Sequence, residues 1–462
     1  MAPTIYIVTD LTFGDGGKGT IVDALARHTG IKNIVRFNGG SQAAHNVITP
    51  QGLHHCFAQF GSGMLLPDTH TIVSRYMLIN PSSMLVENSA LQNKGVTSAM
   101  ARTFISENSA IITPWHELIN QMREIARGNN RHGSCGKGVW EATCDLNYSS
   151  RITLFAKNLD KIDLIKEKIG FIQQMKLDIA EQLYDQNPAY REQLFPLLEK
   201  VRWADQEKIA ESYQAFFKQA KIVTDDFILE KICRQGAIFE GAQGVLLDAD
   251  YGFHPYVTSS NTTMINAEEM LKQAGISPQR QTVRIGVMRG YMTRHGAGPL
   301  VTEDQALHNF VPPDHNEWND WQQDFRLGWF DLIATKYALS VAGKIDALAI
   351  TNLDRMAKIP LVKVALFYRG KEVRPDLFIS NGEDVIVQIR KPALPQQNEN
   401  NALTNALFAA EPVYFSDHLW TGKNIADRYV DPGYIKFLEE RLGVPVKILS
   451  FGPTAKDKLF YP

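Results

Sequence analysis

The chain has 462 residues, 44% hydrophobic and 21% charged, and its 48 Lys and Arg residues nearly balance 50 Asp and Glu. This composition excludes disordered, collagen-like and coiled-coil proteins, and the net charge of −2 disfavours general nucleic-acid binding. The four cysteines include no Cys-x-x-Cys pair, so neither a zinc site nor a thioredoxin motif is indicated. With no basic N-terminal segment and no apolar run of about 18 residues, we expect a cytoplasmic protein without a membrane segment.

Short runs rich in β-branched residues alternate with helical patterns along the chain. The predicted strands are residues 5–8, 33–36, 70–73, 110–112, 237–239, 283–288, 346–351, 361–367 and 446–450, and helical patterns include residues 18–26, 331–341 and 432–442. Strands separated by helices favour an α/β fold with a large, mostly parallel central sheet flanked by helices.

Residues 158–235 have a different pattern, with helical spacing that we expect Pro188 and Pro196 to interrupt. We interpret this stretch as a helical subdomain within one domain spanning residues 1–462; a peripheral packing layer is the simpler alternative. Residues 391–402 are polar and contain proline, which predicts a surface loop.

A glycine-rich loop, Phe-Gly-Asp-Gly-Gly-Lys-Gly-Thr, follows the first predicted strand at residues 13–20. Strand, glycine loop and helix form the arrangement that wraps backbone N–H groups around phosphate. The loop resembles a P-loop but lacks the Walker A residues, since positions 12 and 19 are Thr and Gly. Lys18 supplies a positive charge. Asp15 would repel phosphate unless a cation intervened, so it is a candidate Mg²⁺ ligand, general base or both, or else an Asx-turn residue.

Two later segments carry further candidate groups. Residues 35–46 read Val-Arg-Phe-Asn-Gly-Gly-Ser-Gln-Ala-Ala-His-Asn, and His45 there is a candidate acid or phosphate donor. Residues 239–248 and 255–263 follow another predicted strand and are rich in hydroxyl and amide side chains. They indicate ligand binding, or more simply a capped helix start.

Together these segments resemble the adenylosuccinate synthetase family. Its W-G-D-E-G-K-G-K, V-R-x-x-G-G-x-N-A-G-H-T, F-E-G-A-Q-G-x-L-L-D and Y-V-T-S-S-N-T-T correspond to residues 13–20, 35–46, 239–248 and 256–263. Its T-R-V-G-A-G-P, G-W, T-K-L-D, G-V-P and S-x-G-P are similar to residues 293–299, 328–329, 351–354, 443–445 and 450–453. The order is kept over nearly the whole chain.

The resemblance implies a Mg²⁺-dependent ligase that uses GTP to phosphorylate the 6-oxygen of inosine monophosphate, which the amine of aspartate then displaces. It implies that Asp15 is general base and Mg²⁺ ligand, that the Ala44 carbonyl is a second metal contact, and that His45 is the acid partner. Lys18 would stabilise phosphate charge and Gln243 would orient the base. The nucleotide-binding residues that it implies are Gly14, Gly16, Gly17, Gly19, Thr20, Gln42, Asn46, Cys135, Arg151, Thr258, Asn352, Asp354, Ser450 and Gly452.

Further expectations follow from the same resemblance. Asp354 would accept both guanine N–H donors and select GTP. The partners would be small molecules, with neither nucleic acid nor membrane, and the chain would form a homodimer in which Arg151 reaches the partner's nucleotide.

Several positions depart from the family. Gly16 replaces Glu, Gln42 replaces Asn, and Ala44 and Asn46 replace the Gly and Thr beside His45. Cys135 replaces a phosphate-binding Thr, and Asn352 replaces Lys.

The largest departure lies before Gly328, where the family has an arginine-rich loop, T-T-G-R-R-R-R-T-G-W, that binds aspartate. Here residues 320–327 read Asp-Trp-Gln-Gln-Asp-Phe-Arg-Leu, and the candidate amine-site residues are Gln323, Arg326 and Arg294. Because guanidinium groups are the usual partners of carboxylates, we expect poor use of aspartate and better use of an amine with one carboxylate or none. Formation of adenylosuccinate, with aspartate held by Arg289, Arg294 or Lys336, stays the leading hypothesis for the function. The alternatives are a ligase for a different amine or purine-like acceptor, or a nucleotide-binding protein without ligase turnover.

Overall fold

A large central sheet organises the protein. The computed structural model describes residues 4–277, 282–311, 321–322, 324–370, 373–393, 401–417, 420–421 and 430–461. Within them, a ten-stranded sheet has the order β19 (Lys458–Phe460), β18 (Val446–Ser450), β13 (Ala347–Thr351), β9 (Thr282–Arg289), β1 (Ile5–Asp10), β8 (Ala237–Glu240), β2 (Asn33–Arg36), β5 (His70–Val73), β6 (Thr103–Ser106) and β7 (Lys221–Val223). Neighbours are parallel except β18 and β19, which confirms the predicted α/β fold.

Helices cover both faces of this sheet, so its central strands are buried and have apolar centres. One face packs against α1 (Lys18–Thr29), in a cluster that joins Val8 and Ile238 to Ile21 and Leu25. The other face packs against α8 (Asp225–Gln235), α9 (Ile265–Gln273) and α11 (Leu332–Ala342). Residues 18–26 and 331–341 are therefore helical, as expected.

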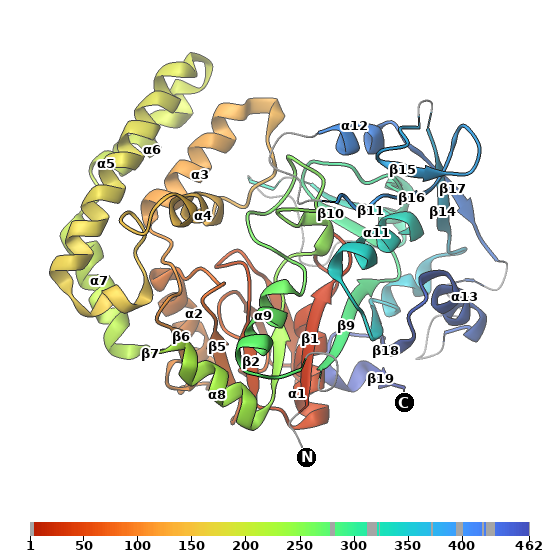
Figure 1. Cartoon of the computed structure of the whole chain (residues 1–462), viewed down its shortest axis with the longest axis horizontal. Helices are drawn as coiled ribbons and strands as arrows, with labels where there is room; N and C mark the ends of the chain where they lie inside the picture. Colours follow the sequence, from red (N-terminus) through yellow and green to blue (C-terminus); the bar gives the residue numbers. More distant parts are fainter. Residues whose placement is uncertain are drawn as a thin grey trace.

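Smaller sheets lie beside the central one (Figure 1). A second sheet contains β12 (Phe330–Asp331), β14 (Val364–Arg369), β15 (Phe378–Ser380), β16 (Val385–Ile389) and β17 (Glu411–Phe415), with α12 (Ala402–Phe408) and α13 (Pro432–Leu442) in the same half of the chain. Two antiparallel pairs, β3 (His45–Ile48) with β4 (His54–Phe57) and β10 (Met292–His295) with β11 (Phe325–Gly328), complete the strands of the described residues.

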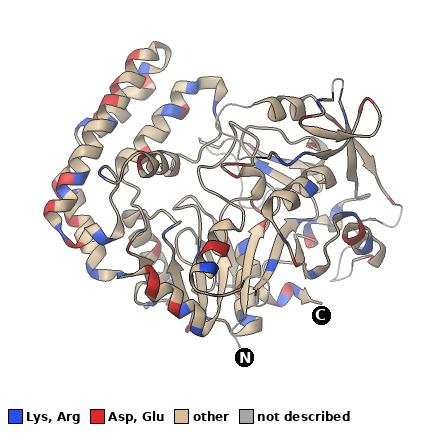
Figure 2. Ribbon diagram, viewed as in Figure 1, with Lys and Arg blue, Asp and Glu red and all other residues tan. Residues whose placement is uncertain are grey.

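The remaining helices form the opposite side of the molecule (Figure 1). They are α2 (Pro81–Asn93), α3 (Pro114–Arg127), α4 (Val139–Tyr148), α5 (Ile162–Gln186), α6 (Arg191–Arg202) and α7 (Gln206–Gln219). One apolar cluster joins α2, α3, α5, α6 and α7, and charges of both signs are interspersed along α5, α6 and α7 (Figure 2). The predicted helical stretch 158–235 also contains β7, which joins the edge of the central sheet.

Three sequence predictions differ from the structure. Residues 110–112 are buried but make isolated bridges instead of a strand, and the strand of this region is β6. The predicted strand 361–367 begins at Val364 and belongs to the second sheet. Pro196 lies inside α6, so the helical stretch is interrupted only near Pro188.

The predicted loop 391–402 falls partly outside the described residues. No described helix is both long and apolar enough to cross a bilayer.

Candidate active site

The carboxyl ends of six strands open onto one cavity of about 1030 Å³. Loops after β1, β2, β8, β9, β13 and β18 contribute to its walls, as expected for ligand sites in parallel sheets. The predicted residues that line it are Gly14, Asp15, Gly17, Lys18, Gly19, Thr20, Gln42, Ala44, His45, Asn46, Cys135, Gln243, Thr258, Arg294, Asn352, Asp354, Ser450 and Gly452. Three predicted residues that the structure describes, Gly16, Arg151 and Arg326, lie outside the lining. Gln323 lies outside the described residues.

Backbone strain is concentrated at this cavity. Asp15, Gln243 and Asn352 have φ values of 58°, 57° and 56°, and within the described chain they are the non-glycine residues with positive φ. Such conformations cost about 1–3 kcal/mol each and persist where the surrounding structure enforces them, often at functional sites. All three line the cavity, so the strain supports its functional role.

The loop between β1 and α1 brings a lysine and a carboxylate to the cavity. Lys18 is the first residue of α1, is 4% exposed, and places Nζ 3.2 Å from Asp10 Oδ2. The Asp15 carboxylate lies 3.6 Å from His295 Nε2, and its main-chain oxygen accepts a hydrogen bond of 2.6 Å from Arg289 Nε. The start of α1, with its free N–H groups and Lys18, is therefore a place for phosphate.

The oxygen atoms near this loop suit Mg²⁺. The Asp15 carboxylate and the Ala44 main chain belong to the cavity walls, and both offer hard oxygen ligands. The described residues contain no cluster of three or more His, Cys, Asp or Glu able to hold a metal. A magnesium ion here would therefore complete its coordination with phosphate oxygens and water, as it commonly does.

His45 is held by a buried carboxylate. Its Nδ1 lies 2.6 Å from Glu240 Oε1, while Glu240 Oε2 accepts a hydrogen bond of 3.0 Å from Ser62 N, and the Ser62 hydroxyl donates to Oε1. Burial lowers the pKa of His45. Burial alone would raise the pKa of Glu240, but His45, Arg36 and Ser62 lower it to about 2. His45 therefore uses Nδ1 for Glu240 and keeps Nε2 for a ligand.

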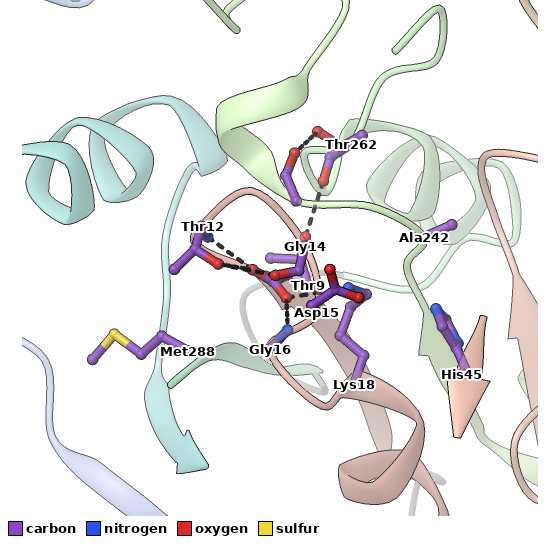
Figure 3. A network of polar contacts seen from close by, with 12 residues as sticks. Thr9, Thr12, Gly14, Asp15, Gly16, Lys18, His45, Ala242, Thr262 and Met288 are labelled. Carbon is purple, nitrogen blue, oxygen red and sulfur yellow. Dashed lines mark hydrogen bonds and ion pairs between the residues drawn. The ribbon is translucent and has the colours of Figure 1, made fainter. Parts of the chain in front are cut away.

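Gly19 permits this placement of His45. A Cβ atom at residue 19 would lie 2.8 Å from His45 Cβ and 2.9 Å from Ser62 Oγ, closer than real contacts allow. The first turn of α1 and strand β3 thus approach one another because residue 19 has no side chain. Figure 3 shows Asp15 and Lys18 on the loop and His45 on β3 pointing into the same region.

Two amide side chains await a partner. Among the described residues, Gln42 Nε2, Gln42 Oε1 and Gln243 Oε1 are buried and have no hydrogen-bond partner. A Cβ at Gly39 would lie 3.2 Å from Gln243 Oε1 and 3.4 Å from Gln42 Nε2, so the two amides lie near each other. Both side chains line the cavity, so their amide groups are available to a bound ligand or to water.

Another wall contains Asp354, the residue predicted to bind guanine, and three other predicted nucleotide-binding residues. Asn352 and the exposed Asp354 follow β13, and Ser450 and Gly452 follow β18. The β13 and β18 loops are joined by the hydrogen bond of 3.1 Å from Leu353 N to Ser450 O. These side chains are therefore grouped on one wall.

The wall facing α3 holds the loop that contains Cys135. Glu124 accepts hydrogen bonds from Gly133 N and Ser134 N at 3.1 and 3.3 Å. Burial raises the pKa of the Cys135 thiol. Arg151, expected to reach a partner subunit, is exposed and lies over the Phe171 ring at 4.9 Å.

The predicted amine-site arginines hold the main chain of residues 296–299. Arg294 donates to Ala297 O, Pro299 O and Tyr256 O at 3.0, 2.8 and 3.3 Å. Arg326 donates to Gly296 O and Gly298 O at 3.0 and 2.7 Å and pairs with Glu303 at 2.8 Å. Their guanidinium groups are thus engaged in shaping this turn.

Sequence reasoning did not identify four groups near the site: Asp10, Glu240, Arg289 as a partner of Asp15, and His295. Glu240 is a lone carboxylate in an apolar strand, and Asp10 is the acid that ends the first strand. Both are sequence signals for a buried charge that needs a partner. His295 stands where the family motif has Val, and Phe325, its cross-strand partner, stands where the family has Arg.

Similarity to known proteins identifies the family of this chain. The family model described as adenylosuccinate synthetase matches residues 7–459. Adenylosuccinate synthetase 2 of Chromobacterium violaceum is 30% identical over 461 residues, covering 98% of this chain and 97% of that protein. The solved structure of fully ligated adenylosuccinate synthetase from Plasmodium falciparum has a TM-score of 0.75 at 21% identity, covering 99% of this chain and all of the other. The solved structure of cyanophage S-2L succinoaminodeoxyadenylate synthetase with dGMP and dATP has a TM-score of 0.58 at 15% identity, covering 100% of this chain and 96% of the other. The chain belongs to the adenylosuccinate synthetase family.

Proposed function

We propose that the protein is a GTP-dependent carbon–nitrogen ligase that activates the 6-oxo group of a purine nucleotide, with inosine monophosphate as acceptor, for attack by an amine. The observation that carries this proposal is the convergence of Asp15, Lys18 and His45 on one cavity at the carboxyl edge of the sheet. An acid, a phosphate-binding lysine and an oriented histidine are a set suited to phosphoryl transfer. Membership of a GTP-dependent ligase family supports it.

The first step forms the bond between the 6-oxygen and the γ-phosphorus. Asp15 accepts the N1 proton of the purine as the 6-oxygen attacks, and the bond between the γ-phosphorus and the leaving oxygen of GDP breaks. Lys18 and the N–H groups at the start of α1 stabilise the charge on the phosphoryl oxygens. His45, oriented by Glu240 through Nδ1, faces the transferring group with Nε2.

The second step exchanges oxygen for nitrogen at carbon 6. The amine forms the new C–N bond and gives up one N–H proton, the C–O bond breaks, and phosphate leaves with the original 6-oxygen and that proton. Magnesium, held by the Asp15 carboxylate and the Ala44 carbonyl, would neutralise phosphate charge. On the opposite wall, the Asp354 carboxylate would accept from the guanine N–H groups of GTP.

For the identity of the amine substrate, a second candidate besides aspartate has specific support. Arg294 and Arg326 already hold main-chain oxygens, and the sequence from residue 295 to 325 has six acids and no Lys or Arg. Each carboxylate of aspartate needs charged donors to offset its desolvation. We therefore favour an amine with one carboxylate, or none, over aspartate. Of the other cations named for aspartate, Lys336 does not line the cavity, and Arg289, which does, has its Nε taken by Asp15 O.

The test is release of phosphate from GTP in the presence of inosine monophosphate and a panel of amines. We expect release that depends on the acceptor and is lost by at least 10²-fold in Asp15→Asn, because an amide cannot take the N1 proton. Alanine and glycine should give higher kcat/KM than aspartate. A micromolar KM for aspartate alone would refute the second candidate, and normal turnover of Asp15→Asn would refute the mechanism.

A further inference from the structure

A buried carboxylate lies beneath the glycine loop. Asp10, the last residue of β1, is fully buried. Its Oδ1 accepts hydrogen bonds from Thr12 N and Thr12 Oγ1 at 2.8 and 2.7 Å, and its Oδ2 accepts from Gly16 N at 2.7 Å and from Lys18 Nζ at 3.2 Å. Thr12, Gly16 and Lys18, the residues that make these contacts, are labelled in Figure 3. One side chain therefore fixes both ends of the loop and the lysine beyond it.

Residue 16 is glycine because this carboxylate occupies the adjacent space. A Cβ there would lie 2.4 Å from Asp10 Oδ2 and 3.0 Å from Asp10 Cγ. Gly16 is not among the described glycines with positive φ, so space and not backbone conformation imposes the residue. The family motif has glutamate at this position. This chain thus lacks the family's glutamate at residue 16 and carries Asp10 beneath the loop.

The contacts of Asp10 differ in kind from the other contacts that hold the loop. Thr351 Oγ1 donates to Gly16 O at 2.6 Å, and Arg289 Nε donates to Asp15 O at 2.6 Å. Those bonds hold carbonyl groups, whereas Asp10 holds an N–H group and the ammonium of Lys18. A lysine ammonium has three N–H donors. With one directed at Asp10, the other two remain for phosphate oxygens in the cavity.

We propose that Asp10 is a positioning residue for phosphoryl transfer, which acts through Lys18 and Gly16 and requires glycine at residue 16. This inference rests on the proposed function. Asp10 does not line the cavity, so it acts on the substrate only through the loop. Without it, the Lys18 ammonium would be buried without a counter-ion and would leave its present position.

The first experiment replaces Asp10 by asparagine, which keeps the size and one acceptor oxygen. We expect kcat for phosphate release to fall by about 10²-fold, because displacement of a positioned group by about 1 Å costs this much. The KM for GTP should stay within about threefold, since the wall that holds Asp354, Ser450 and Gly452 is unchanged. Asp331→Asn is the matched control, because Asp331 is also buried, accepts a hydrogen bond from Ala334 N and does not line the cavity. It should change stability and leave kcat unchanged.

The second experiment is a double-mutant cycle of Gly16→Ala and Asp10→Ala. With Asp10 present, alanine at residue 16 should lower kcat at least tenfold and lower the urea midpoint, since its Cβ meets the carboxylate. In the Asp10→Ala background, the same change should alter kcat by no more than about twofold. It should leave the urea midpoint unchanged within error. Equal effects of Gly16→Ala in both backgrounds would overturn the pairing.

The two readouts separate this inference from the proposed function. Wild-type protein that releases no phosphate from GTP with any acceptor refutes the proposed function and the catalytic part of this inference, while the urea midpoints still test the pairing. Active wild-type protein with an unchanged Asp10→Asn variant refutes the role of Asp10 alone. Asp10→Asn and Asp331→Asn variants with equal losses of kcat would also refute it.

Discussion

Replacement of Glu240 tests most directly how the ring of His45 is oriented for catalysis. In Glu240→Gln, one carboxylate oxygen becomes an NH₂ group. At the Oε2 position this group would face Ser62 N, a main-chain donor that cannot reverse its role. At the Oε1 position it would donate to His45 Nδ1 and force the proton of the ring onto Nε2. The first arrangement sets two donors against each other, the second reverses the hydrogen bond to His45, and both remove the negative charge beside His45.

The size of the effect follows from the contacts of Glu240. His45, Arg36 and Ser62 together lower the pKa of this carboxyl to about 2, so it is a carboxylate that accepts from His45. A hydrogen bond to a charged group contributes about 1.5–3 kcal/mol. Losing it at the upper end of this range lowers a rate about 10²-fold. We therefore expect kcat for phosphate release to fall by about 10², with the KM for GTP within a few-fold of wild type.

The assay is steady-state phosphate release, with the tautomer of His45 read by nitrogen-15 NMR. Glu87→Gln is the matched control, because Glu87 is also buried and accepts hydrogen bonds from Ala58 N and Gln59 N at 3.0 and 2.8 Å. It should lose stability but keep kcat. A Glu240→Gln enzyme with kcat within threefold of wild type, or equal losses in both variants, would refute the reasoning.

Two further changes give measurable outcomes. Asp354→Asn should weaken GTP and improve xanthosine triphosphate, because an amide can donate to the 2-oxo group of xanthine; competition kinetics check this, and unchanged preference would refute it. Burial raises the pKa of Asp331 from 3.8 to about 6, so the folded state loses stability as pH rises through this window. The free energy of unfolding of Asp331→Asn in urea, relative to that of wild type, should therefore rise by up to about 3 kcal/mol between pH 4 and 7; parallel pH profiles of the two proteins would contradict it.

The fold was largely predictable because the central strands are buried on both faces. β1, β2 and β8 are buried along almost their whole length and have apolar centres, which the sequence marks clearly. Residues 110–112 have the same composition, yet they are held by isolated bridges to Ile79 and Phe155. Local composition reports burial, and pairing depends on residues that are distant in the chain.

The site was predictable where its residues lie in glycine loops. Asp15 and Lys18 stand in a loop whose composition indicates phosphate binding, and both line the cavity. Glu240 and Asp10 were missed because their roles depend on contacts that the local pattern does not contain. Glu240 meets a histidine 195 residues away, and Asp10 meets an amide and an ammonium across a turn.

The most direct test of the proposed chemistry follows the 6-oxygen of the acceptor. Inosine monophosphate labelled with oxygen-18 at the 6-oxo position is incubated with GTP, Mg²⁺, the enzyme and the best amine of the panel, and the released phosphate is examined by mass spectrometry. Activation of the 6-oxo group predicts one oxygen-18 atom in each phosphate released. Unlabelled phosphate, formed by hydrolysis of GTP while the acceptor keeps its label, would contradict it.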